Sequence, residues 1–189
     1  MKLWDKGFST DKKIDHFTVG NDRELDLHLA KYDVIASKAH AKMLGEIGLL
    51  TPKETKDLVN ELNNIAARIE KGTFSIEKSF EDMHSKIEYM LTLSLGDTGK
   101  KIHTARSRND QVLVAMHLYL KDELTEIKSM TKSLFNLLLV KAQEHKDVML
   151  PGYTHLQIAM PSSFGLWFSA YAESLIDDLY FIDAAYKVV

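Results

Sequence analysis

The chain has 189 residues, enough for a buried core in one or two domains. Its 45% hydrophobic and 27% charged residues are the proportions of an ordinary soluble globular protein, and its net charge of −3 argues against a nucleic-acid-binding protein. Because there is no cysteine, disulfides, thiolate metal sites and cysteine nucleophiles are all excluded. No apolar run approaches the roughly 20 residues of a membrane span, and the first residues are neither a secretory nor a transit signal. We therefore expect a cytoplasmic protein without a membrane or nucleic-acid partner.

Helix signals dominate the first half of the chain. A first helix is predicted over about residues 22–47, where it reaches two glycines. Thr51 followed by proline is typical of a helix start, so a second helix is predicted from there to residue 71. A third is predicted over about residues 77–95, and it also ends at a glycine.

The second half of the chain predicts longer helices. Neither glycine nor proline interrupts residues 107–144, and apolar residues recur there every seven positions, which favours one long helix of a bundle. Residues 152–160 are predicted as a break, and Pro161 as the start of another helix that continues to the last residue. No segment shows the alternation of a strand. We therefore expect an all-α fold, with a small N-terminal helical domain over 1–105 and the first long helices of a bundle over 106–189.

The predicted final helix has neither a cap nor a polar tail. Two long helices alone also leave much apolar surface uncovered. We expect that the sequence is a piece of a longer protein and that further helices or other subunits cover this surface.

The segment His103–Gln111 concentrates polar side chains at the start of the predicted long helix. It includes Arg106 and Arg108. Backbone N–H groups at a helix start attract anions, and arginine matches a carboxylate with two parallel donors. One interpretation is therefore a carboxylate-binding corner. The other is that Ser107 caps the helix while the arginines are solvated.

A second polar segment, residues 151–157, lies in the predicted break. Its His155 can transfer protons near neutral pH because the ordinary histidine pKa is about 6.5. Thr154 and Gln157 are placed to orient a ligand. The alternative is a histidine that simply hydrogen-bonds to the loop backbone.

The third segment, residues 80–84, precedes or begins the third predicted helix. Glu81 and Asp82 favour a helix start, where acidic side chains complement the helix dipole. His84 would be a zinc ligand only if other ligands converged on it, and no paired metal-binding spacing is present. We therefore expect neither a metal nor another cofactor.

Taken together, these segments resemble the N-terminal part of the argininosuccinate lyase branch of the fumarase/aspartase superfamily. The resemblance covers nearly the whole chain and is most specific in the segment His103–Gln111. The matching segments, in chain order, are residues 3–4, 32–34, 37–40, 81–84, 103–111 and 151–157.

The resemblance implies specific tasks for several of these residues. Ser107, Arg108, Asn109 and Thr154 would bind substrate, and His155 would be the catalytic histidine. In addition, Asp82 would lie beside the site, with His84 near it. Gly20 stands where the family often has a serine, so a side-chain contact there is lost or replaced by a backbone contact. The superfamily's glycine-serine-serine loop, with its catalytic serine, is absent from the sequence.

The implied activity is the β-elimination of argininosuccinate to arginine and fumarate in arginine biosynthesis, without a cofactor. The implied assembly is a homotetramer whose active sites are each built by three subunits, so this chain alone is expected to be inactive and to self-associate. Whether the base is His155 or the absent serine stays open. Three alternatives also stay open: another superfamily lyase such as an adenylosuccinate lyase, a non-enzymatic lens crystallin, and a purely helical scaffold.

Overall fold

The computed structural model describes residues 11–189, apart from the side chains of residues 12 and 15. It divides into two compact units, Met1–Tyr119 and Leu120–Val189. This division falls within a long helix, whereas the boundary predicted near residue 105 stays a prediction. The matching residues 3–4 lie outside the described part of the chain.

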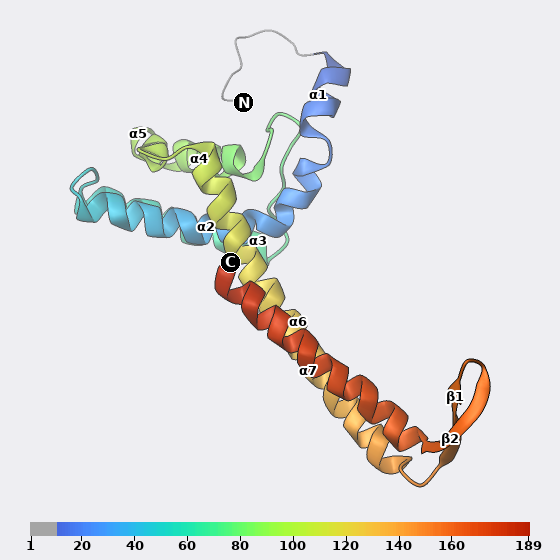
Figure 1. The fold of residues 1–189 in the computed structure, drawn as a ribbon. Coiled ribbons are helices and arrows are strands. Elements are labelled where there is room, and N and C mark those ends of the chain that lie inside the picture. The colour runs from blue at the N-terminus through green and yellow to red at the C-terminus, as the bar shows by residue number, and fades with distance from the viewer. Residues whose placement is uncertain (1–10) are drawn as a thin grey trace. The chain divides into compact units, whose positions relative to one another are not determined.

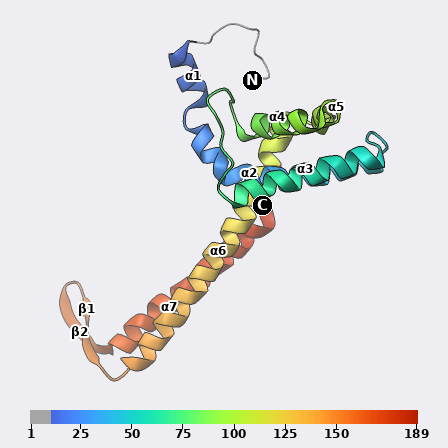
Figure 2. The same cartoon turned by 180° about the vertical axis from the view of Figure 1, so that it is seen from behind.

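The first unit is helical (Figures 1 and 2). Its elements are α1 (Lys12–Val19), α2 (Asp22–Glu46), α3 (Pro52–Glu70), α4 (Met83–Leu95), α5 (Asp97–Lys100), the 3-10 turn η1 (Lys101–His103) and the beginning of α6 (Arg108–Glu144). The three longest helices before α6 pack on one another, with α2 against both α3 and α4. Their apolar faces form the core, and fully buried side chains include Leu44, Leu58, Leu62, Ile65 and Leu91.

The start of α3 agrees with its prediction. The Thr51 hydroxyl accepts from the Glu54 backbone N–H at 3.2 Å, and the Glu54 carboxylate accepts from the Thr51 N–H at 2.9 Å. This reciprocal pair is a capping box, and Pro52 occupies the first helical position.

The predicted start of the third helix is wrong, because α4 begins at Met83 rather than near residue 77. Asp82 caps it by accepting from the Ser85 backbone N–H at 2.7 Å. The preceding residues are held from α2 instead: Arg23 donates to the Phe80 carbonyl at 2.8 Å, and Asp26 accepts from the Met83 N–H at 2.9 Å. These long-range contacts leave no local signal in the sequence.

The second unit contains the rest of α6, the strands β1 (Met149–Thr154) and β2 (Gln157–Ser163), and α7 (Phe164–Val188). The strands form an antiparallel hairpin where a break was predicted. Pro161 pairs with Pro151 inside this hairpin and does not start a helix. A two-stranded sheet consists only of edges, so it tolerates both prolines. Ser163 caps α7 by accepting from the Leu166 N–H at 3.1 Å.

Helices α6 and α7 lie side by side in the second unit (Figures 1 and 2). A Cβ on Gly165 would lie 2.6 Å from the Ala142 carbonyl oxygen, so the close approach of the two helices requires glycine. Lys128 and Asp183 form an ion pair between them. Many apolar side chains remain exposed on both helices, among them Met130, Leu134, Leu137, Leu166, Trp167 and Tyr171. No helix among the described residues is long and apolar enough to cross a membrane.

Candidate functional site

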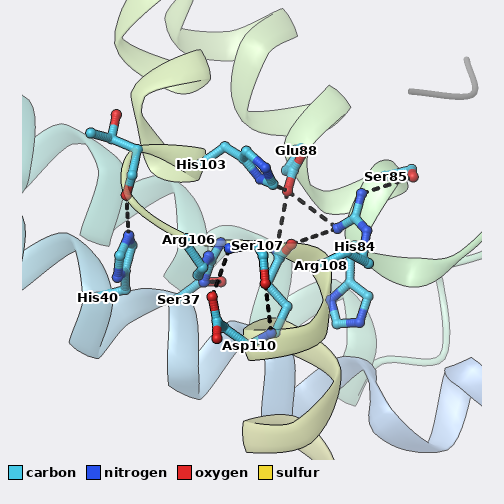
Figure 3. Close-up of polar contacts among 12 residues, drawn as sticks. Ser37, His40, His84, Ser85, Glu88, His103, Arg106, Ser107, Arg108 and Asp110 are labelled. Atoms are coloured by element: carbon cyan, nitrogen blue, oxygen red, sulfur yellow. Dashed lines mark hydrogen bonds and ion pairs between the residues drawn. The ribbon is translucent and has the colours of Figure 1, made fainter. Parts of the chain in front are cut away.

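The start of α6 is closed by a reciprocal pair of hydrogen bonds (Figure 3). The Ser107 backbone N–H donates to Asp110 Oδ2 at 2.7 Å, and the Asp110 N–H donates to the Ser107 hydroxyl at 3.3 Å. The bond from the Ser107 backbone lowers the pKa of Asp110 below its usual value of 3.8. Ser107 therefore caps the helix, as one of the two interpretations predicted, and it remains exposed together with Asn109.

Arg108 is not solvated, contrary to the rest of that interpretation. Its Nε lies 3.3 Å from Asp82 Oδ2, and its Nη2 donates to the Ser85 hydroxyl at 3.3 Å. Its Nη1 donates to Gln111 Oε1 at 2.7 Å and to Glu88 Oε1 at 3.3 Å. All three guanidinium nitrogens thus contact side chains of α4, its cap or α6 itself. Figure 3 shows the contacts of Arg108 with Ser85 and Glu88.

Glu88 joins residues from both sides of the turn that precedes α6. Besides Arg108, its Oε1 contacts His103 Nδ1 at 3.0 Å and accepts from Gln111 Nε2 at 3.1 Å. Gln111 is only 1% exposed although it is polar. The amide of Gln111 is therefore hydrogen-bonded inside the protein and is not available to a ligand.

Arg106 points from the same turn towards α2. Ala105 has a φ of 55°, in the left-handed region that residues other than glycine rarely adopt, and the turn that follows carries Arg106 inward. There its Nη1 donates to the Ser37 hydroxyl at 3.1 Å. Burial lowers the pKa of Arg106. His40, which like Ser37 belongs to α2, donates from Nε2 to the Thr104 carbonyl at 2.9 Å. Burial lowers the pKa of His40.

His84 is fully inside the first unit. Its Nδ1 lies 2.9 Å from Asp33 Oδ1, and the two side chains are 2% and 1% exposed. A group this buried cannot touch a substrate without a rearrangement. The described residues contain no group of three or more potential metal ligands around it.

The second group of predicted site residues lies at the tip of the hairpin. Thr154 pairs with Gln157, so the loop between the strands consists of His155 and Leu156. Their φ angles are 50° and 63°. Positive φ at both loop residues is typical of a type I′ turn, in which asparagine and glycine are the favoured residues. All four residues are exposed, and Leu156 is 98% exposed.

This turn is therefore conformationally unfavourable in two residues at once. Left-handed backbone at residues other than glycine is found preferentially at functional sites. His155 is one of the two loop residues of the hairpin, and its side chain is exposed. A sequence pattern could not reveal this turn, because the two residues carry no turn signal.

The structure thus gathers Asp82, His84, Ser107, Arg108 and Asn109 around the first turns of α4 and α6. Thr154, His155 and Gln157 belong to the other unit. The sequence did not predict Asp33, Ser37 or Glu88 as parts of the polar network. Asp33 and Ser37 lie in segments that match the family, whereas Glu88 carried no signal.

Comparison with known proteins assigns the chain to a family. The sequence model of a family described as "Lyase" matches residues 7–189. The argininosuccinate lyase of Phocaeicola vulgatus is 58% identical over 188 residues, covering 100% of this chain and 42% of that protein. The argininosuccinate lyase of Thermotoga neapolitana is 43% identical over 188 residues, covering 100% of this chain and 47% of that protein. The chain therefore spans less than half the length of these relatives.

Solved structures support the same fold. The "fumarate lyase:delta crystallin" of Brucella melitensis superposes with a TM-score of 0.75 at 19% identity, over 93% of this chain and 46% of that one. An EDDS lyase variant with bound fumarate superposes with a TM-score of 0.70 at 22% identity, over 95% of this chain and 35% of that one. At these identities the likeness concerns the fold alone. Because the family's sequence model covers nearly the whole sequence, the chain belongs to the lyase family.

Proposed function

We propose that this chain is part of a carbon–nitrogen lyase that cleaves argininosuccinate to arginine and fumarate by β-elimination. The observation that carries the proposal is the segment His103–Gln111, whose backbone is fixed by internal contacts while Ser107 and Asn109 stay exposed. Relatives at up to 58% identity that are named argininosuccinate lyase support the choice of substrate.

The chemistry requires groups that bind developing negative charge. Elimination begins by removing a proton from the carbon next to a carboxylate, which places a second negative charge on that carboxylate. The guanidino nitrogen then leaves as arginine. Prearranged donors stabilise such an intermediate, and removing one typically costs roughly 10²–10³-fold in rate. Ser107 and Asn109 at the start of α6, together with Thr154, are the proposed donors.

Arg108 and Asp82 form an ion pair in the proposed site. A substrate carboxylate would share the guanidinium with Asp82 and Glu88, so Arg108 would contribute both charge and the placement of its neighbours. His84 is buried, so it would act indirectly, through the residues that lie between it and the substrate. Gln157 would help to orient the ligand next to Thr154.

His155 is proposed as the catalytic histidine. It is exposed and held by an unfavourable turn, as expected for a group that must reach into a site formed with other chain segments. It would either remove the proton itself or polarise the group that does. General acid–base catalysis of this kind contributes roughly 10²–10⁴-fold.

The proposed enzyme is a cytoplasmic homotetramer in which one active site receives segments from different subunits. The exposed apolar side chains of α6 and α7 support an assembly, since a surface of this kind normally meets a partner. We expect the chain by itself to be inactive and to self-associate. A monodisperse monomer in size-exclusion chromatography would contradict the self-association, and fumarate release by the chain alone would contradict the inactivity.

The decisive experiment is an assay of the full-length protein with argininosuccinate and, in parallel, adenylosuccinate. Formation of fumarate is followed by its ultraviolet absorbance. Release from argininosuccinate alone is the expected result. Release from adenylosuccinate alone would identify another lyase of the superfamily, and no release from either substrate would favour a non-enzymatic homologue.

A further inference from the structure

The carboxylate of Glu88 is the meeting point of three donors that come from one short segment. They are His103, which lies before the turn at Ala105, and Arg108 and Gln111, which lie after it, at 3.0, 3.3 and 3.1 Å from the same Oε1. Glu88 itself belongs to α4 and is 18% exposed. The contact therefore ties α6 and the residues before it to a separate helix (Figure 3).

The segment needs such a tie because its backbone is unfavourable. Ala105 has a φ of 55°, and no glycine relieves it. An isolated chain would leave this conformation, so contacts elsewhere must impose it. Hydrogen bonds to an ionised group are stronger than those between neutral groups, and here a single carboxylate receives several.

What the tie fixes is the direction of the exposed side chains. Ser107 and Asn109 alternate along the chain with Arg106 and Arg108, which are held inward by Ser37 and by the α4 residues. If the inward side chains keep their places, the outward ones must keep theirs as well. Glu88 can therefore control the orientation of the ligand-binding side chains without contacting the ligand itself.

We propose that Glu88 is a positioning residue of the site, which sets the orientation of Ser107 and Asn109 towards the substrate. This inference rests on the proposed function, since it concerns how that site binds. It assigns Glu88 no part in proton transfer.

The test compares Glu88→Ala and Glu88→Gln in the full-length protein. The matched control is Glu77→Ala, because the Glu77 carboxylate also forms an ion pair in this unit, with Lys86 at 2.6 Å, and is half-exposed. Two measurements are made on each variant: kcat and KM for argininosuccinate, and the hydrogen-exchange rate of the peptide that covers residues 103–111. The second measurement reports local opening and does not require activity.

For Glu88→Ala we expect kcat to fall roughly tenfold or more, with a smaller rise in KM, because Ser107 and Asn109 are the proposed donors to the developing charge. We also expect faster exchange in residues 103–111. Glu88→Gln should lie between this variant and the wild type, because its amide oxygen still accepts hydrogen bonds. Glu77→Ala should match the wild type in both measurements.

A folded Glu88→Ala protein with wild-type kcat and wild-type exchange would overturn the inference. If that variant does not fold, Glu88→Gln is judged by the same two measurements. A wild-type protein that releases no fumarate would instead refute the proposed function, so the two failures can be told apart.

Discussion

His84 Nδ1 lies 2.9 Å from Asp33 Oδ1 in the interior of the first unit, between α4 and α2. The approach is close, but its angles are not those of a hydrogen bond, so the two groups interact mainly through their charges and dipoles. Removing one member of a buried polar pair leaves the other without compensation in a low-dielectric interior.

Replacement of Asp33 by alanine is therefore expected to destabilise the protein by about 3 kcal/mol. The free energy of unfolding from urea denaturation measures this. Asp97→Ala is the matched control, because Asp97 is 92% exposed and pairs at the surface with Lys100, so its loss should have little effect on the free energy of unfolding. Equal destabilisation by the two substitutions would show that the buried pair contributes no more to the free energy of unfolding than the surface pair does.

His155→Asn in the full-length protein is expected to lower kcat by roughly 10²-fold or more, because an amide cannot transfer a proton. Asparagine tolerates left-handed backbone better than most residues, so the turn should be kept. Circular dichroism and the thermal midpoint should match the wild type, since His155 is exposed. Near-normal turnover would remove His155 from the mechanism.

Leu156 offers a direct measure of strain in the hairpin. Its φ is 63° and its side chain is 98% exposed, so little packing is lost on substitution. We expect Leu156→Gly to stabilise the protein by about 0.5–1 kcal/mol. Glycine adopts this backbone without the steric penalty that leucine has, and the penalty removed is larger than the additional conformational entropy that glycine loses on folding.

The companion variant Leu156→Val should be less stable than the wild type, because β-branched residues disfavour positive φ most strongly. Thermal unfolding of the three proteins gives the order. If the glycine variant melted below the wild type, the turn would be unstrained in solution.

The ion pair between Glu54 and Lys101 predicts a pH dependence of stability. Hydrogen bonds from Lys101 first, and then from Thr51, lower the pKa of Glu54 from 4.5 to about 2. Because the folded-state pKa lies below the unfolded-state value, the ionised carboxylate stabilises the fold above pH 4.5. This stabilisation is lost as the pH falls from 4.5 through about 2.

Glu54→Gln is the suitable variant, since glutamine can still complete the capping box with Thr51. The wild type should be the more stable of the two at neutral pH, and their urea midpoints should converge across the acidic range. A stability difference that is independent of pH would mean that the ion pair with Lys101 contributes nothing measurable.

Residues close together in the chain determined what could be predicted here. The capping box at Thr51 and the uninterrupted run of helix formers over α6 are local signals, and both helices begin within one residue of the prediction. The polar segment His103–Gln111 was likewise visible, because its residue types are adjacent.

Only the tertiary structure decided the rest, because the deciding partners are distant in sequence. Arg108 turns inward since α4 places Asp82, Ser85 and Glu88 around it. The start of α4 is delayed because α2 binds the preceding loop through Arg23 and Asp26. The sequence thus determined which groups are present and where α3 and α6 begin. Packing determined which of those groups are neutralised inside the protein and which remain free to meet a ligand.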